Sequence, residues 1–208
     1  MPELLSLDEI ETLIYQILSG KKVVLVPTST DESMPVVLKQ PTSNDLMVAN
    51  HVYNFYYDKA KKDGFLTIPD LKKFLNEKGL YTDADDAKVK ELEEKIRVEK
   101  IVKSKYKMLE KNKKDIDKLI EGLQAQADEI KSKLSDRLGM TVEGRAGEEK
   151  LVYLTYLGTY YLDKEVRIWD TIDEFNSEPD IVFRNSVVRE YSYFIGGLPL
   201  KTVRYIAR

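Results

Sequence analysis

The chain has 208 residues, of which 42% are hydrophobic and 33% are charged, and its formal net charge is -3. This hydrophobic content permits a sizeable core, and the small net charge is not that of a general polyanion binder. The sequence contains no cysteine and a single histidine, His51, which excludes a disulfide framework and a thiolate metal site and nearly excludes a histidine-dependent zinc site or a Ser-His triad. We expect His51 to lie on a helix face.

Neither a secretory signal nor a membrane span is expected. The chain begins with acidic residues, Glu3, Asp8 and Glu9, where a signal peptide would be basic. No later apolar run reaches the ~18 residues that a membrane span needs. We therefore expect a soluble intracellular protein without a membrane partner.

The chain opens with a predicted helix followed by a predicted hairpin. Ser6 and Glu9 have the spacing of a capping box, and the helix should end at Gly20. Two β-branched runs, 22–27 and 34–39, predict a two-stranded hairpin. We expect the first helix and later helices to cover one face of this hairpin, because a lone hairpin is marginally stable. The apolar residues of the first helix are Leu4, Ile10, Leu13, Ile14 and Ile17.

An aromatic-rich helix should follow, with Ser43 or Asn44 as its cap and an end near Lys62. A platform for stacking bases would need basic residues among the aromatic ones, and none occurs between Ser43 and Tyr57. We therefore expect these rings to pack on the hairpin.

The next stretch imitates a calcium-binding loop around Gly64. Lys59 and Lys61 stand at the first and third ligand positions, where carboxylates would be needed, so we expect no calcium site. Gly64 instead should end one helix, and Thr67 should cap the next, which ends at Gly79.

The charged run from Asp86 to Arg137 predicts one continuous helix, capped by Thr82 or Asp83. Its apolar residues recur in steps of three and four, and about fifty residues would make a rod of roughly 75 Å. So narrow an apolar stripe needs a partner helix, from this chain or from another. The candidate partner-binding residues are Val102, Tyr106, Leu109, Ile116, Ile120, Leu123, Ile130 and Leu134.

The same run carries a local excess of positive charge. Ten basic and four acidic residues lie from Lys95 to Lys118, and the densest part holds Lys103, Lys105 and Lys107. These side chains could contact phosphates, but the solvated exterior of a coiled coil has much the same composition. Nucleic-acid binding is the less favoured interpretation.

The remaining part is predicted to be helical. Glycines between Gly139 and Gly147 predict a turn, and an apolar return helix reaching Tyr161 should pack on the long helix or on the N-terminal part. A loop or strand at 163–169 precedes a short helix capped by Asp170 or Thr171. A last long segment begins at Pro179 and stops at Gly196, and 201–208 begins another amphipathic turn.

The sequence thus predicts a mainly α protein with a small N-terminal β-hairpin, a long central coiled-coil-type helix and an α-helical C-terminal part. Three segments are expected: an α+β body at 1–82, the charged helix at 83–138 and a helical segment at 139–208. No pair or cluster of residues points to a catalytic, cofactor-binding or metal site. We expect an interaction protein rather than an enzyme.

Several short phrases resemble tailed-bacteriophage proteins described as tail or baseplate assembly chaperones and tail structural proteins. These phrases are LKQPTSND (Leu38–Asp45), LNEKGLYTDAD (Leu75–Asp85), the Thr141, Glu143, Ala146 pattern, WDTIDEF (Trp169–Phe175) and IAR (Ile206–Arg208).

The resemblance implies a non-enzymatic assembly protein that acts in the host cytoplasm or becomes a component of the virion. It would bind another tail or baseplate protein, such as a tape-measure or hub subunit, and could form a homo-oligomer through its long helix. The alternatives are a virion structural subunit, or a nucleic-acid-associated regulator that uses the basic face of the long helix.

Overall fold

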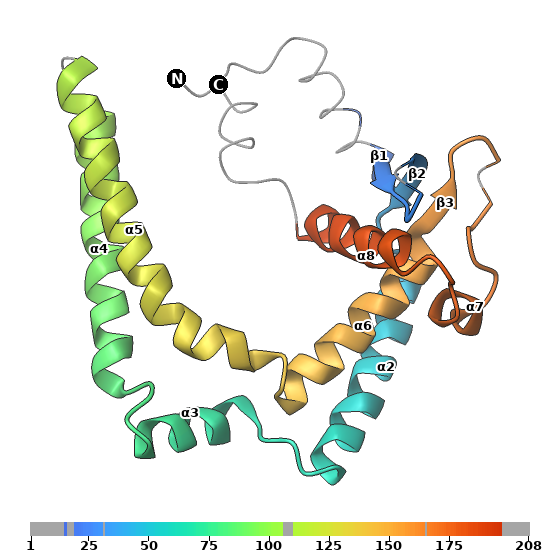
Figure 1. Ribbon diagram of the computed structural model, residues 1–208, viewed down its shortest axis with the longest axis horizontal. Helices are drawn as coiled ribbons and strands as arrows, with labels where there is room; N and C mark the ends of the chain where they lie inside the picture. Colours follow the sequence, from blue (N-terminus) through green and yellow to red (C-terminus); the bar gives the residue numbers. More distant parts are fainter. Residues whose placement is uncertain (1–14, 16–18, 31, 106–109, 165, 197–208) are drawn as a thin grey trace. The chain divides into compact units, whose positions relative to one another are not determined.

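The computed structural model describes Tyr15 and residues 19–30, 32–105, 110–164 and 166–196 (Figure 1). The chain forms two compact units, one made of 1–55 with 147–208 and the other of 56–146. These boundaries differ from the three segments expected at 1–82, 83–138 and 139–208. The reason is that the sheet of the first unit takes strands from both ends of the chain.

The sheet has three antiparallel strands in the order β1-β2-β3. β1 (Lys21–Pro27) and β2 (Ser33–Lys39) form the predicted hairpin, with Val24 opposite Val36. β3 (Thr159–Tyr161) pairs with β2. This third strand was predicted as the end of the return helix, because Tyr160 and Tyr161 continue its helical spacing.

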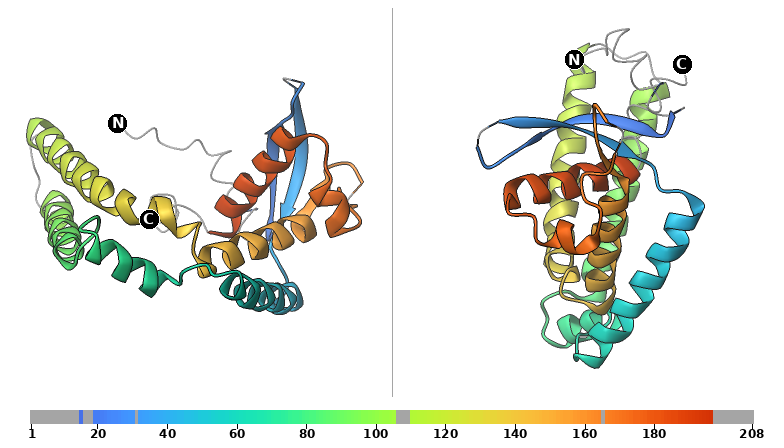
Figure 2. Two further views of the ribbon diagram at one scale, coloured as in Figure 1. Left: turned by 60° about the horizontal axis from the view of Figure 1, so that its bottom comes forward. Right: turned by 90° about the vertical axis from the view of Figure 1, so that its right-hand side faces the viewer.

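The inner face of the sheet carries the core of the first unit. Val24 and Val26 of β1 and Val36 and Leu38 of β2 are buried there, as expected for residues two apart on a strand. Three helices supply most of the opposing side chains: α6 (Val142–Gly158), α7 (Ile172–Asn176) and α8 (Ile181–Ile195). Figure 2 shows α8 lying across the strands. One face of the hairpin is thus covered by later helices, as predicted, whereas the expected contribution of the first helix falls on residues outside the described ones.

Tyr191 of α8 joins three elements of this core. Its hydroxyl donates a hydrogen bond to the Lys39 carbonyl oxygen at 3.1 Å, and burial raises the pKa of the phenol. A Cβ at Gly158 would stand 2.3 Å from the Tyr191 ring. Only glycine therefore lets α6 pass this close to α8.

α2 (Ser43–Lys62) begins one residue after its cap, which is Thr42 and not Ser43 or Asn44. Thr42 and Asp45 form a reciprocal capping box, with the Thr42 N–H donating to the Asp45 carboxylate at 2.9 Å. From α2 only Ala49 enters the core cluster, and Phe55 is exposed. The prediction that the aromatic face packs on the hairpin is therefore wrong for Phe55, because a different side of α2 meets the core. His51 lies exposed on α2, as predicted.

α3 (Ile68–Glu77) has the predicted ends. Thr67 caps it by accepting a hydrogen bond from the Asp70 N–H, and Pro69 lies in its first turn. Gly64 and Gly79 have φ values of 85° and 67°, which favour glycine, before and after the helix. The predicted roles of Gly64, Thr67 and Gly79 at the ends of these helices are confirmed.

The charged run forms two helices, α4 (Asp83–Lys105) and α5 (Glu110–Leu138), where one continuous helix was predicted. They lie side by side and antiparallel, since Glu93 accepts from Lys131 at 2.7 Å and Asp85 accepts from Lys133 at 3.1 Å (Figure 1). We call this helical hairpin the coil. The narrow apolar stripe finds its partner within the chain, where closing a short loop costs little entropy.

Two predicted features lie outside the described residues or largely so. The first helix is described only at Tyr15 and Ser19, and the terminal turn at 201–208 is not described. The part that is described confirms the fold class: mainly helical, with a small sheet that begins at the N-terminal hairpin.

Candidate protein-binding surface on the coil

The basal half of the coil is fixed by a buried cluster. Leu71 and Leu75 of α3 and Tyr81 of the following loop are buried, and Ile130 and Leu134 of α5 pack against them. These contacts join α3 to the last turns of α5. The basal half is therefore a small core in its own right.

A polar network lies beside this cluster. The Tyr81 hydroxyl donates to Asp86 Oδ1 at 2.5 Å, and Lys72 Nζ lies 3.2 Å from Asp86 Oδ2. The hydrogen bond from Tyr81 is the main cause that lowers the pKa of the Asp86 carboxyl. Desolvation, followed by this hydrogen bond, raises the pKa of Tyr81 to about 12. The network holds the start of α4 against α3.

The first turn of α4 is also bonded to α5. The Asp85 carboxylate accepts a hydrogen bond from the Thr82 N–H at 2.8 Å, which is the main cause that lowers its pKa, and another from Lys133 of α5. Thr82 is thus the cap of α4, one of the two residues predicted for that role.

The distal half of the coil, residues 96–105 with 110–123, is packed much more thinly. Ile96 is the last buried side chain among those of α4 that the structure describes. Beyond it, Val98 is 45% exposed, Leu119 of α5 is 48% exposed, and Ile101 is also exposed. Two helices alone cannot enclose this end of the apolar stripe.

The predicted partner-binding residues mostly line the contact between α4 and α5. Tyr106 and Leu109 lie outside the described residues, and the other six are half-buried. Those six are Val102, Ile116, Ile120, Leu123, Ile130 and Leu134. Part of each surface is already used within the chain, so their role toward another protein stays a prediction.

Exposed and half-buried apolar residues gather on one flank of the distal half. Val98 and Val102 are one helical turn apart on α4, and the ion pair between Lys103 and Asp117 sets Val102 level with Leu119. Helical wheels drawn from the residues that line the α4–α5 contact place Val98, Val102 and Leu119 on the same side of the coil. We call these three residues the distal flank.

Gly122 follows Leu119 by three residues and borders the distal flank. A Cβ at this position would meet nothing within 4 Å. A glycine inside a helix costs about 1 kcal/mol relative to alanine. No contact within the described fold accounts for that cost.

The sequence interpretation missed Val98 and Leu119 because it followed a single heptad stripe. Both residues fall outside that stripe, next to it on the helical wheel. Their signal was available in the four-residue spacing of Val98 and Val102, which defines a second apolar row on α4.

The basic cluster is partly neutralised by its own neighbours. Lys103 pairs with Asp117, Lys95 with Glu91 at 2.6 Å, and Arg97 with Glu94 at 2.7 Å. Lys107 lies outside the described residues, and so does the side chain of Lys105. The described part of this surface is a mixture of both signs of charge.

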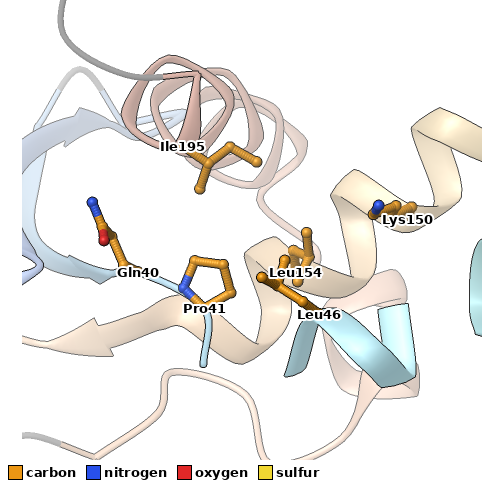
Figure 3. A pocket seen from close by; sticks show the side chains of 6 residues that line it. All are labelled: Gln40, Pro41, Leu46, Lys150, Leu154 and Ile195. Carbon is orange, nitrogen blue, oxygen red and sulfur yellow. The ribbon is translucent and has the colours of Figure 1, made fainter. Parts of the chain in front are cut away.

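A hollow of about 390 Å³ in the first unit has few polar groups that could bind a ligand. Its lining is mostly aliphatic, and Lys150 donates a hydrogen bond to Asn50 Oδ1 at 2.7 Å. In Figure 3, Lys150 stands apart from the aliphatic side chains. The lining residues are Gln40, Pro41, Leu46, Lys150, Leu154 and Ile195.

Within the described ranges, no group of three His, Cys, Asp or Glu side chains could hold a metal ion. None of the described helices is long and apolar enough to cross a membrane.

The phrases that resemble phage tail proteins have structural roles where the structure describes them. Thr82 and Asp85 cap α4, Thr141 and Ala146 are buried, and the rings of Trp169 and Phe175 meet edge to face at 4.7 Å in the core. These residues explain how the chain folds rather than what it binds. No protein-family model, no curated protein and no solved structure matches the chain.

Proposed function

We propose that this chain is a non-enzymatic assembly protein that binds a helix of another phage tail or baseplate component. The observation that carries the proposal is the distal flank, where Val98 and Leu119 are exposed beside the half-buried Val102. The resemblance to tail assembly chaperones supplies the class of partner, such as a tape-measure or hub subunit in the host cytoplasm.

The flank fits a third helix by its geometry. Two antiparallel helices present a row of apolar residues on either side of their contact, and a third helix buries such a row in a bundle. The absence of a side chain at Gly122 lets a partner backbone approach closely beside Leu119. Each exposed aliphatic side chain that becomes buried contributes about 1.5–3 kcal/mol before the costs of association.

Co-expression with single candidate partners tests the proposal. The tagged chain is produced with the tape-measure protein, and separately with the baseplate hub protein, of the genome that encodes it. We expect one of them to co-purify with the unaltered chain, and the double variant Val98→Lys, Leu119→Lys to lose that partner while its helical circular dichroism is unchanged.

The control is Ile101→Lys, which places the same charge on an exposed residue of α4 that faces away from the distal flank. It should retain the partner. Equal loss in both variants, or full retention in the double variant, contradicts the assignment of the flank. Failure of both proteins to co-purify with the unaltered chain contradicts the function.

The two alternative functions give different results in the same system. A virion structural subunit would stay with purified particles at a fixed stoichiometry, whereas an assembly protein would be lost from them. A nucleic-acid regulator would bind DNA or RNA with an affinity that falls steeply with salt and is lost on reversing Lys103, Lys105 and Lys107. The ion pair of Lys103 with Asp117 makes this second alternative the weaker one.

A further inference from the structure

The sheet of the first unit is closed along one edge by the chain itself. This edge is β3, where the Tyr161 N–H donates to the Val166 carbonyl oxygen at 2.9 Å. The Ile168 N–H in turn donates to the Thr159 carbonyl oxygen at 3.2 Å. Residues 166–168 thus occupy the outer side of β3, and the other edge of the sheet is β1.

Hydrogen bonds at both ends of β1 show which of its backbone groups face β2. The Gln40 N–H donates to the Gly20 carbonyl oxygen at 2.8 Å. The Thr28 N–H donates to the Glu32 carbonyl oxygen at 2.9 Å. Both pairs continue the register of the two strands. Because bonded pairs recur at every second residue of an antiparallel ladder, the even-numbered residues of β1 bond to β2.

The odd-numbered residues of β1 therefore direct their backbone groups away from β2. In agreement with this pattern, Leu25 lies opposite Pro35, which has no N–H to donate. Within the described residues, no hydrogen bond uses the N–H of Val23 or Leu25 on this outer side. Val23 is 51% exposed and Leu25 is 69% exposed. We call this outer side of β1 the open edge.

The open edge lacks the features that keep edge strands from pairing. β1 has no bulge, since each of its seven residues has one partner in β2. Two lysines and Pro27 stand at the ends of the strand, and the four residues between them, 23–26, are uncharged. The middle of β1 is therefore suited to pairing with one more strand.

α8 lies under β1 and is fixed to it near both ends of the strand. The Ser29 N–H, just beyond the end of β1, donates to Asp180 Oδ2 at the start of α8 at 2.9 Å. Towards the other end, Lys22 Nζ lies 4.0 Å from Glu190 Oε2. The buried valines of β1 share a core cluster with α8 between these two points. A strand added beside β1 would therefore have α8 beneath it.

The side of α8 that borders the open edge exposes apolar residues. Glu190, which lies near β1, marks this side, and Tyr191, which bonds to the end of β2, marks the opposite one. Helical spacing places Val182 and Tyr193 on the side of Glu190. Both residues are exposed. Inward-pointing side chains of an added strand would contact them.

The open edge is basic where β1 begins. Lys21 and Lys22 are the first two residues of the strand. Arg189 Nε of α8 lies 3.7 Å from Glu190 Oε1, and the other oxygen of this carboxylate lies near Lys22. Three basic side chains thus accompany one carboxylate. An added strand with an acidic residue at this end would complement the charge.

A second copy of the chain fits the open edge poorly. Two β1 strands paired around a two-fold axis would place both α8 helices on the same face of the joined sheet. Paired strands are about 4.8 Å apart, whereas packed helices need axes about 8–10 Å apart. Because α8 lies under β1, the two α8 helices would overlap. A strand without a helix beneath it meets no such obstacle.

We propose that the open edge binds an extended segment of another protein, which adds to the sheet as a fourth strand. One set of its alternate side chains is apolar and contacts Val23 and Leu25. The other set is also apolar and contacts Val182 and Tyr193 of α8. An acidic residue lies beside Lys22. This site belongs to the first unit, so it does not depend on what the coil binds.

A displayed library of short random peptides tests the site, with the full chain as the target. Peptides that also bind the variant Leu25→Pro are discarded. Proline at this position deletes an N–H of the open edge but no hydrogen bond to β2. We expect peptides rich in β-branched residues, with an acidic residue at one end, that bind Leu25→Pro about tenfold more weakly than the unaltered chain.

The matched control is Leu25→Thr, which shortens the same side chain but keeps its N–H. It should bind the selected peptides nearly as well as the unaltered chain. Circular dichroism checks that Leu25→Pro is folded, and Val23→Pro, which deletes the other N–H of the open edge, serves as the second variant. Equal loss of binding in the threonine and proline variants would mean that backbone pairing is not the contact.

A change in the peptide gives an answer that does not depend on the folding of a variant. The backbone nitrogens of the tightest peptide are methylated one at a time. Only every second N–H of an added strand faces β1, so the affinity should fall at alternate positions. Lys21→Glu with Lys22→Glu should weaken the same peptide several-fold at low salt. A methylation profile without alternation contradicts strand addition.

Two further results would overturn the proposal. One is a selection that yields no peptide able to distinguish the unaltered chain from Leu25→Pro. The other is a dimer, detected by light scattering, that Leu25→Pro dissociates, because a second copy would then occupy the open edge.

Discussion

The two halves of the coil are built from the same helices but are stabilised very differently. The basal half has a buried cluster around Leu75 and Tyr81, and a polar network through Asp86. Among the described side chains of the distal half, none is buried beyond Ile96 on α4, and Val98 and Leu119 are exposed. The basal half therefore contributes a core to the fold, whereas the distal half keeps apolar surface that the described fold does not bury.

This difference follows from the number of elements at each end. At the base, α3 adds a third helix to α4 and α5 and completes the burial of their apolar residues. At the distal end two of the described helices meet, and two helices cannot enclose a stripe wider than their own contact. A partner helix at the distal end would play the part that α3 plays at the base.

The largest expected effect comes from shortening one buried leucine in the basal half and one exposed leucine in the distal half. Leu75→Ala should lower the free energy of unfolding by about 2–5 kcal/mol, because it leaves a cavity in the buried basal cluster. The matched change Leu119→Ala in the distal half should cost no more than about 0.5 kcal/mol. Urea unfolding followed by circular dichroism measures both, and equal losses would mean that the halves are packed alike.

A second expected effect is a pH dependence of stability that arises from the basal half of the coil. The pKa of Asp86 is lowered by the hydrogen bond from Tyr81 and by Lys72. The Asp86 carboxylate therefore contributes fully to the free energy of unfolding above the ordinary pKa of an aspartate. This contribution is lost as the pH falls through the lowered value, below about pH 4. Asp86→Asn should therefore destabilise the chain at pH 7 and make its urea midpoint less sensitive to acid.

The control for this change is Asp128→Asn on the exposed side of α5, which should leave the acid sensitivity unchanged. If the Asp86→Asn variant keeps the same drop in urea midpoint between pH 7 and pH 3, the network does not stabilise the base as described.

The smallest expected effect has opposite signs for stability and binding. Gly122→Ala should stabilise the isolated chain by about 0.5–1 kcal/mol, since the position is helical and has space for a methyl group. The same methyl group should weaken co-purification of the tail partner, because it projects beside the distal flank. A variant that gains stability and keeps full binding would remove Gly122 from the proposed surface.

Much of the fold could be predicted from local chemistry. The hairpin follows from two β-branched runs, and Thr67 and Thr171 cap their helices through hydrogen bonds from Asp70 and Glu174. These features depend on neighbours within a few residues, which the sequence displays directly.

The reversal of the charged run could not be predicted in this way. No proline or glycine marks the region between Lys105 and Glu110, and the apolar stripe continues with helical spacing on both sides. Periodicity reports which face is apolar but not where a chain turns back. β3 was missed for a related reason, because pairing with β2 overrides the helical spacing of its tyrosines.

The candidate surface was predicted only in part for the same physical reason. A heptad pattern identifies residues that contact another helix. The six described residues among the predicted eight lie at or beside the contact between α4 and α5. Which apolar residues are left over depends on how far two helices can enclose the stripe. That quantity is set by tertiary packing, so Val98 and Leu119 emerge only from the structure.

The central claim is that the coil closes within one chain, and a distance between two spin labels tests it most directly. Labels on Glu93→Cys and Lys131→Cys replace a pair in contact across the coil. The account predicts a short distance, set by helix axes about 8–10 Å apart, that persists when labelled protein is diluted with unlabelled protein. A distance near 57 Å, which a continuous helix would give, or a short distance that disappears on dilution, would contradict it.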